Sequence, residues 1–337
     1  MKPTDFAYHL SNYLSKHLPG EIGAGKNTVL SYRDTFRLLL EFAKRNGIKE
    51  ECLTLSRIDK PLIDRFLSWI ELERNCCATT RNQRLAAIHA FFSYMQSVLP
   101  DYIFQFQEIM AIPMKKTHQK TIDFLSDEGV ALLLAQPDIQ AKSGRKHLVI
   151  LSFMFATACR VQELCDTRAA DALCNKNAVS RLTGKGNKSR YVPLDTAFVE
   201  LLRQYMEEFC LNDESRSMDL LFKNHSGHKY TRQGITYVVK KYGALARLQN
   251  PGLIPEDISA HTLRHSRAVS LLRSGMDLIY IRDILGHVSV KTTEIYARID
   301  SEMKRKALEK ASGNPVNEEM PVWQRDKPLM DWLKSLG

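Results

Sequence analysis

The segment that most constrains the fold of this chain runs from residue 259 to residue 298 and reads SAHTLRHSRAVSLLRSGMDLIYIRDILGHVSVKTTEIYAR. Because glycine commonly follows the last turn of a helix, Gly275 and Gly286 are predicted to end two short helices. Asp277 and Ser289 are suited to cap the helices that follow. The segment is therefore predicted to fold as one compact unit of three helices.

This unit carries side chains that suit a phosphodiester. His261 and Arg264 are three positions apart and share one face of the first helix. His287 follows the second helix, and Tyr296 lies in the third. A guanidinium group can hold an anion, an imidazole can move a proton and a hydroxyl can attack phosphorus, so the set indicates phosphoryl chemistry.

The order and spacing of these residues resemble the C-terminal signature of the tyrosine recombinases, a family that includes phage integrases and Xer-type resolvases. That signature consists of an H-x-x-R box, an L-G-H box and a tyrosine. Here the first box begins at His261, the second ends at His287, and Tyr296 follows nine positions later. The resemblance covers residues 25 to 300 and implies a site-specific DNA recombinase.

Residues 157 to 164, TACRVQEL, resemble the family's first box, T-G-x-R-x-x-E-L. The residues alone fit a salt bridge between Arg160 and Glu163, which are three positions apart on a helix. The resemblance implies a phosphate clamp, with Glu163 fixing the geometry of Arg160. Ala158 stands where the family usually has glycine, so the local backbone conformation is the feature to check there.

Residues 178 to 194, AVSRLTGKGNKSRYVPL, are predicted to form a β-hairpin with its turn at residues 184 to 187. On its own, G-K-G is typical of a polar loop tip, and the spacing of a phosphate-binding P-loop is absent. The family pattern G-K-G-x-K-x-R-x-V-P-L places a lysine of such a hairpin at the scissile site. Lys185 occupies that position and is implied to protonate the leaving 5′ oxygen.

Two sets of basic and polar residues are implied to contact DNA. Residues 80 to 85, TRNQRL, resemble the T-x-N-x-R-L pattern of the family's core-binding domain, which implies DNA-backbone contacts from Arg81 and Arg84. A solvated polar face is the alternative that the residues alone leave open. Within residues 220 to 242, the implied DNA contacts are Arg232, Gln233, Lys240 and Lys241.

The chain of 337 residues is long enough for two domains, and its predicted fold class is mostly α with a small antiparallel β-sheet. Helical periodicity predicts helices near residues 28–47, 61–73 and 79–95. The resemblance to the tyrosine recombinases implies four parts of the chain: a helical core-binding (SAM-like) domain at 1–116, a linker at 117–121, an α+β catalytic domain at 122–302 and a tail at 303–337.

The tail contains a group of apolar side chains that need burial: Trp323, Leu329, Met330, Trp332, Leu333 and Leu336. The residues alone leave open that the tail docks on its own chain. The family precedent is docking on a neighbouring protomer, which would link a tetramer on DNA.

Composition limits the possible partners. The net charge of +10 and the pI of about 9.2 suit a polyanion, although charge alone does not identify DNA. No apolar run approaches the ~20 residues that cross a bilayer, and the N-terminus lacks a signal-peptide core, so we expect no membrane partner and a cytoplasmic, nucleoid-associated protein. The seven cysteines are odd in number and lack a C-x-x-C pair, so reduced thiols are expected. His225 and His228 have no further ligand pattern for zinc, and no metal or other cofactor is expected.

The implied reaction cuts and rejoins DNA through a 3′-phosphotyrosyl link, in integration, excision, transposition or resolution. Arg160 and Arg264 would grip the phosphate, His261 would act as a base or donor, and His287 would stabilise the transition state. The implied partners are a double-stranded recombination site, further copies of the chain and accessory recombination proteins. A type IB topoisomerase-like enzyme and a non-catalytic DNA-binding regulator are the alternatives. The implied catalytic residues are Arg160, Lys185, His261, Arg264, His287 and Tyr296, with Glu163 in support.

Overall fold

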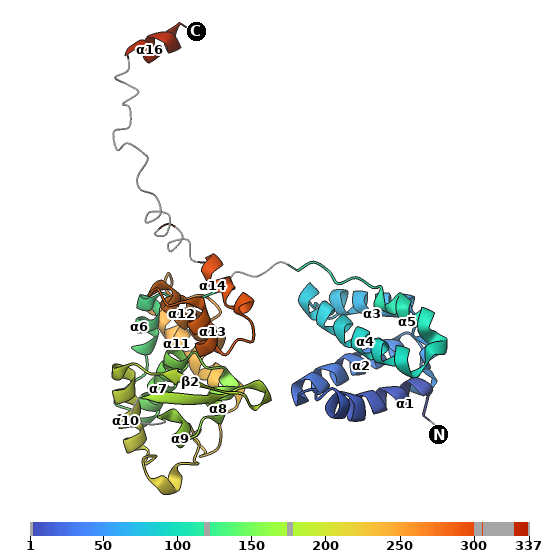
Figure 1. Cartoon of the computed structure of the whole chain (residues 1–337), viewed down its shortest axis with the longest axis horizontal. Helices are drawn as coiled ribbons and strands as arrows, with labels where there is room; N and C mark the ends of the chain where they lie inside the picture. Colours follow the sequence, from blue (N-terminus) through green and yellow to red (C-terminus); the bar gives the residue numbers. More distant parts are fainter. Residues whose placement is uncertain (1–2, 118–121, 174–177, 300–304, 306–326, 336–337) are drawn as a thin grey trace. The chain divides into compact units, whose positions relative to one another are not determined.

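The computed structural model describes all residues except 1–2, 118–121, 174–177, 300–304, 306–326 and 336–337. The side chains of five further residues also lie outside the description, namely Lys185, Arg298, Ile299, Leu329 and Met330. Contacts within the chain divide it into two compact units, Met1–Lys120 and Thr121–Gly337 (Figure 1).

The first unit is helical in its described part, and the three helices predicted from periodicity are present as α2, α3 and α4. Asp59 caps α3 by accepting a hydrogen bond from the Leu62 N–H, and a proline at the start of that helix suits a position without a donor. The helices are α1 (Asp5–Asn12), a π-helical segment (Tyr13–Glu21), α2 (Lys26–Arg45), α3 (Lys60–Leu72), α4 (Ala78–Val98) and α5 (Ile103–Met110). Three short 3₁₀ turns are at Glu50–Cys52, Leu55–Arg57 and Pro100–Tyr102.

Aromatic side chains fill the core of the first unit. Phe91 on α4 packs edge-on against Phe6, Phe36 and Phe92, with ring centroids 5.1 to 5.9 Å apart. Edge-to-face contacts of this kind add to the stabilisation that burial itself provides. These contacts hold α1, α2 and α4 together.

In its described residues, the second unit is a helical assembly with one small β-hairpin. Ser126, Thr231 and Asp277 accept hydrogen bonds from N–H groups in the first turns of α6, α11 and α13, and the cap predicted at Asp277 is confirmed. Its helices are α6 (Asp127–Leu134), α7 (Lys142–Thr157), α8 (Val161–Asp166), α9 (Ala169–Ala172), α10 (Thr196–Glu208), α11 (Arg232–Gln249), α12 (Ala260–Arg273), α13 (Leu278–Leu285), α14 (Glu294–Ile299) and α16 (Lys327–Lys334), and its strands are β1 (Val179–Thr183) and β2 (Ser189–Pro193).

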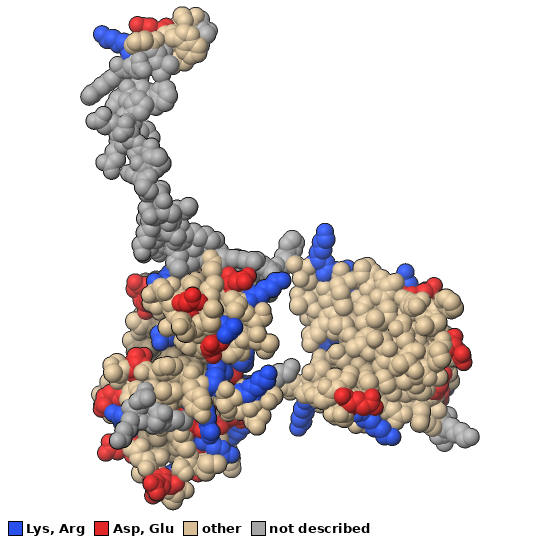
Figure 2. All heavy atoms as spheres, in the orientation of Figure 1, with Lys and Arg blue, Asp and Glu red and all other residues tan. Residues whose placement is uncertain are grey.

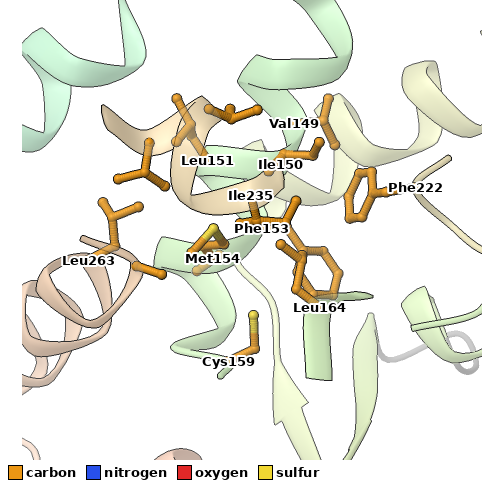
Figure 3. Packing of buried hydrophobic residues seen from close by; sticks show 14 of the residues in the cluster. Val149, Ile150, Leu151, Phe153, Met154, Cys159, Leu164, Phe222, Ile235 and Leu263 are labelled. Carbon is orange, nitrogen blue, oxygen red and sulfur yellow. The ribbon is translucent and has the colours of Figure 1, made fainter. Parts of the chain in front are cut away.

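The main core of this unit forms around α7 (Figure 3). Residues 149 to 154 of α7 are all buried, so this helix is enclosed on every side. Leu164 of α8, Ile235 of α11 and Leu263 of α12 pack against it. The position of α7 matters for the site because the helix ends three residues before Arg160.

The predicted hairpin is present. β1 and β2 pair antiparallel, with Leu182 opposite Arg190 and Thr183 opposite Ser189. The turn between them contains a short 3₁₀ segment, Lys185–Asn187, in which Gly186 has a φ of 75°. A left-handed residue in a tight turn favours glycine because it has no Cβ. The mostly α fold class with a small antiparallel sheet is confirmed.

The segment from 259 to 299 forms the helices α12, α13 and α14. Gly275 and Gly286 both adopt left-handed backbone angles where the first two helices end. The prediction for Ser289 was wrong in one respect, because its side chain caps a 3₁₀ turn, Val290–Thr292, that precedes α14. A second apolar cluster forms here and includes Ala158, Ala268, Leu285 and Tyr296.

The surface of the second unit carries both signs of charge on the face that Figure 2 shows, with Lys and Arg side chains gathered over the part where Figure 1 places the hairpin. Among the described residues, no helix has both the length and the apolar character that crossing a membrane requires.

Candidate active site

The backbone between α7 and α8 places Arg160. Ala158 ends α7 in a left-handed conformation, with φ 48° and ψ 32°. An L-residue in this region is strained by about 1–2 kcal/mol, which explains why glycine is common at such a position. Ala158 is nevertheless fully buried, and the reversal of the chain there leaves Arg160 as the N-cap residue of α8.

Arg160 forms the salt bridge that the sequence predicts. Its Nη1 donates to Oε1 of Glu163 at 2.9 Å, and its backbone N–H donates to Oε2 at 2.8 Å. Its Nη2 donates to the carbonyl oxygen of Gly286 at 3.1 Å, which joins α8 to the end of α13. The side chain remains 39% exposed, so Glu163 fixes its direction while part of the guanidinium group stays open to solvent.

Glu163 is the buried carboxylate of the site. Burial alone would raise its pKa, but hydrogen bonds and charge from Arg190 and Arg160 outweigh that effect, and its pKa lies below the ordinary value. Arg190 on β2 donates to both of its oxygens, at 3.0 and 2.7 Å. A bidentate pair of this kind is strong and directional. Arg190 was not assigned a role from the sequence, although it is the arginine of the G-K-G-x-K-x-R pattern.

Arg264 on α12 is almost completely buried, with 4% of its surface exposed. Its Nη1 donates to the Ala158 carbonyl at 2.6 Å, and its Nη2 donates to the Leu285 carbonyl at 2.5 Å. Both acceptors lie at helix C-termini, where a cation is favoured. Burial, with the nearby charges of Arg160 and Arg190, lowers the pKa of Arg264 to about 10, so it stays protonated at neutral pH.

The charges of this cluster do not balance. Arg160, Arg190 and Arg264 influence one another electrostatically, and the acidic group that acts on them is Glu163. Among the described residues, three guanidinium groups therefore share one carboxylate, and the cluster carries an excess of two positive charges. Enclosed cations without partners are unfavourable, so this arrangement favours an anion such as a phosphate.

Two of the predicted histidines lie beside the arginines. His261 is exposed, and its pKa is lowered by burial of part of the ring and by the charges of Arg264 and Arg160. His287 is partly buried, its Nδ1 is 3.0 Å from Oγ1 of Thr293, and burial with the arginine charges lowers its pKa to about 4. A neutral imidazole at this position can form a hydrogen bond with a phosphate oxygen without adding further charge.

Tyr296 is inside the protein, with 2% of its surface exposed. Its hydroxyl shares a hydrogen bond of 2.8 Å with Nδ1 of His265 on α12. Burial raises the pKa of Tyr296, and the charge of Arg264 acts in the opposite direction. His265 was not predicted as a site residue. The available signal was its position four residues after His261, which places both rings on the same helical face.

Lys185 is at the tip of the hairpin, and its side chain lies outside the described part of the structure. The neighbouring backbone is close to the arginine cluster. A Cβ added to Gly184 would lie 3.0 Å from Oε1 of Glu163 and 3.7 Å from Nη1 of Arg160. The turn that carries Lys185 therefore begins against the predicted phosphate clamp.

The predicted DNA contacts on α11 are exposed. Arg232, Gln233 and Lys240 line a shallow hollow together with Thr236 and Tyr237. Lys240 forms an ion pair with Asp257 at 3.0 Å, and Lys241 packs over the ring of its neighbour Tyr242. The exposed polar face of α11 is suited to contact DNA, and the DNA contacts of these four residues stay a prediction.

Arg81 and Arg84 of the first unit are largely occupied by contacts within that unit. Arg81 is buried, and its Nη1 donates to the Pro113 carbonyl at 2.9 Å. Arg84 donates to Asp34 at 2.6 Å and to the carbonyl of Ser31 at 3.2 Å. These contacts give both arginines a role in the fold, and their DNA contacts stay a prediction.

The described part of the tail is helix α16. Trp332 and Leu333 are 58% and 49% exposed, so these apolar side chains have no cover in the described structure. The remaining residues of the predicted apolar group lie outside the description in whole or in their side chains, namely Trp323, Leu329, Met330 and Leu336.

Comparisons with known proteins find similarity in both units of the chain. The model of the phage integrase family matches residues 123–303, and that of its N-terminal SAM-like domain matches residues 12–97. The integrase/recombinase y4rC of Sinorhizobium fredii is 34% identical over 336 residues, which cover 99% of each chain. The tyrosine recombinase XerC of Pelotomaculum thermopropionicum is 28% identical over 309 residues, which cover 90% of this chain and 97% of the relative.

Two solved structures show a similar fold. The XerH recombinase in a pre-cleavage complex with its difH substrate has a TM-score of 0.64 and 25% identity, over 91% of this chain and 85% of that chain. The Tn1549 transposon integrase bound to transposon right-end DNA has a TM-score of 0.70 and 14% identity, over 90% of this chain and 98% of that chain.

Proposed function

This chain belongs to the phage integrase family of tyrosine recombinases, and from that premise we propose how its side chains cut and rejoin DNA. The protein is a site-specific DNA recombinase. Neither a relaxing topoisomerase nor a non-catalytic regulator is favoured by its relatives. Our proposal concerns the roles of individual residues, the DNA that they contact and the assembly in which they act.

The observation that carries the proposal is the unbalanced arginine cluster next to a buried tyrosine. Arg160 and Arg264 hold the non-bridging oxygens of one phosphodiester, and Glu163 keeps Arg160 in the orientation that this requires. His287 adds a neutral hydrogen bond to an oxygen on which charge develops. The phosphate supplies the negative charge that the cluster lacks.

Tyr296 is the proposed nucleophile. An ordinary phenol with a pKa near 10 is ionised to about one part in a thousand at pH 7, equivalent to ~4 kcal/mol, and burial makes ionisation harder still. A base has to remove its proton, and the phenol has to leave its enclosed position to reach phosphorus. His261 was the base expected from the sequence, but His265 is the imidazole in contact with the hydroxyl.

The proposed reaction has two balanced steps. The phenolic oxygen bonds to phosphorus, the bond to the 5′ oxygen breaks, and Lys185 donates a proton to that oxygen. A 3′-phosphotyrosyl link results and keeps the energy of the phosphodiester. In the second step, a 5′ hydroxyl of another strand gives its proton to Lys185 and attacks phosphorus, the P–O bond to Tyr296 breaks, and the histidine that took the phenol proton returns it.

A covalent-capture experiment tests these roles. The full chain is incubated with a library of nicked duplexes of random sequence. Cleavage close to the nick releases a short fragment that carries the new 5′ hydroxyl. Because this fragment diffuses away, the strand cannot be rejoined and the covalent complex accumulates. We expect a sequence-enriched protein–DNA adduct from the wild type and none from Tyr296→Phe at equal DNA binding. Adducts without sequence enrichment would indicate a relaxing enzyme, and binding without adducts would indicate a regulator.

We also propose that the chain acts as a tetramer on a double-stranded recombination site, with α16 docked on a neighbouring protomer. The support is the exposure of Trp332 and Leu333 on the short helix α16. Deleting residues 313–337 should abolish cooperative assembly on paired sites in a gel-shift titration and preserve binding to a single site. Because the proposed substrate is a DNA recombination site, we also predict a cytoplasmic, nucleoid-associated location and accessory recombination proteins as partners.

A further inference from the structure

Arg190 is the most firmly held arginine of the hairpin. It lies on β2, and 12% of its side chain is exposed, compared with 39% for Arg160. Its Nη1 and Nη2 donate to the two oxygens of Glu163, and its Nε donates to the Ile284 carbonyl at 2.7 Å. The charge of Arg190 is paired with the Glu163 carboxylate through two hydrogen bonds, whereas Arg264 donates to neutral carbonyl oxygens, so a structural role suits Arg190 better than a grip on the phosphate.

Two glycines make room for this arrangement. A Cβ added to Gly286 would lie 3.1 Å from Cδ and from Nη1 of Arg190. On the other side, Gly184 brings the start of the turn to Glu163, as its added Cβ would lie 3.0 Å from Oε1. The start of the turn that carries Lys185 therefore lies close to Glu163, and Arg190, on the strand that follows the turn, is hydrogen-bonded to the same carboxylate.

A two-stranded hairpin is only marginally stable by itself, so its direction depends on the contacts that hold it. At the end away from the turn, the Ser180 hydroxyl donates to the Asp171 carbonyl at 3.1 Å and Arg181 pairs with the Asp171 carboxylate. At the turn end, Arg190 ties β2 to α8 through Glu163 and to α13 through Ile284. The second tie controls the position of the residues next to the turn.

We infer that Arg190 is a positioning residue for the leaving-group step. Through Glu163 and the end of α13, it holds the turn so that Lys185 reaches the 5′ oxygen that leaves. The inference rests on the proposed function, in which Lys185 supplies that proton. Arg190 thereby connects the phosphate clamp, which shares Glu163, to the proton donor on the hairpin.

A substrate with a different leaving group can distinguish a role of Arg190 in positioning the proton donor from a merely structural role. When sulfur replaces the bridging 5′ oxygen, the P–S bond breaks and the product leaves as a thiolate. A thiol has a pKa near 8.5, far below that of an alcohol, so the thiolate needs no proton from the enzyme. A defect in placing the proton donor should disappear with sulfur, and a defect in binding phosphate or in folding should persist.

The experiment measures single-turnover adduct formation on the captured site with oxygen and with sulfur at the scissile position. With oxygen, Arg190→Gln should slow the step by roughly 10²-fold or more, the usual loss when a general acid is removed. With sulfur, the Arg190→Gln rate should return to within about tenfold of the wild type, as should the Lys185→Ala rate. Arg181→Gln removes an arginine of the same hairpin that pairs with Asp171 instead of Glu163, and it should behave as wild type.

Arg160→Lys is the control for a defect in phosphate binding and should stay slow on both substrates. If Arg190→Gln does not fold, Arg190→Lys replaces it, because an ammonium keeps the charge and loses the bidentate fork. If sulfur rescues the rate of Lys185→Ala but not that of Arg190→Gln, the inference is overturned and the proposed function stays intact. A Lys185→Ala defect that sulfur does not rescue overturns the proposed role of Lys185 and the inference with it.

Discussion

The two units of this chain both bury arginine side chains, but they use them differently. In the first unit, Arg81 donates to a carbonyl in the segment after α5, and Arg84 pairs with Asp34, so these cations tie that unit together. In the second unit, Arg264 is as buried as Arg81 and, like Arg81, donates to neutral oxygens, but the cations Arg160 and Arg190 also act on it. Together with Arg160, it leaves a positive charge that no described carboxylate neutralises.

The difference shows that a buried arginine does not by itself mark a functional site. A basic turn at the start of α4 reads as a DNA contact in the sequence, yet in the structure its arginines contact α2 and the chain after α5. The informative quantity is the local balance of charge. That balance is close to neutral around Arg84 and is positive around Glu163.

The largest expected effect comes from truncating one buried arginine in each unit. Arg264→Ala should slow single-turnover adduct formation by roughly 10²–10³-fold, because it removes a donor aimed at the reacting phosphate. Arg81→Ala should lower the free energy of unfolding of the first unit by about 1–3 kcal/mol through the unpaired Pro113 carbonyl. Its adduct rate at saturating protein should stay near that of the wild type. Equal losses of rate in the two variants would contradict the comparison.

A second pair compares a histidine from each unit. His265→Ala should slow adduct formation by about 10²-fold if His265 takes the proton of Tyr296. His89 in the first unit donates one hydrogen bond from Nε2 to the Ile109 carbonyl and serves as the matched control. His89→Ala should change stability and leave the rate unchanged. A normal rate for His265→Ala, with a slow His261→Ala, would return the role of base to His261.

The third prediction concerns pH. Burial lowers the pKa of His147, His265 and His287 to about 4 from an ordinary 6.5. Between these values the unfolded chain binds more protons than the folded one, so the second unit should lose stability as pH falls from about 6.5 to about 4. Hydrogen exchange at pH 7 and pH 5, corrected for intrinsic rates, should show a greater loss of protection in this unit than in the first. Equal losses in the two units would contradict the prediction.

The smallest effect is expected at the backbone. Ala158→Gly relieves about 1–2 kcal/mol of left-handed strain but removes a buried methyl group worth about 0.8 kcal/mol, so stability should change by less than about 1 kcal/mol. Asn75→Gly, at an exposed left-handed residue of the first unit, should be nearly neutral because asparagine tolerates this conformation. Urea denaturation of both variants checks this. A large destabilisation by Ala158→Gly would show that the Ala158 methyl is essential for packing against Tyr296.

Local signals in the sequence were sufficient for much of this fold. Asp277 caps α13, Gly286 ends it, and the hairpin forms around the predicted turn. The Arg160–Glu163 pair follows from spacing on one helix. These features depend on residues that are neighbours in the chain, so a linear pattern can identify them.

The remaining features depend on contacts between distant segments. The pairing of Arg190 with Glu163 spans 27 positions, and that of His265 with Tyr296 spans 31. The burial of Arg81 follows from a contact with Pro113, 32 positions away. No periodicity within one helix encodes these contacts, which is why the sequence predicted Arg160 and Arg264 as site residues and did not predict Arg190 or His265.

The central claim is that the positive cluster at Arg160 and Arg264 presents one phosphodiester to Tyr296. Tandem mass spectrometry of the trapped adduct, after digestion of protein and DNA, tests it most directly. The account predicts a nucleotide joined through its 3′ phosphate to the peptide that contains Tyr296. A nucleotide joined through a 5′ phosphate, or attached to any other residue, would contradict it.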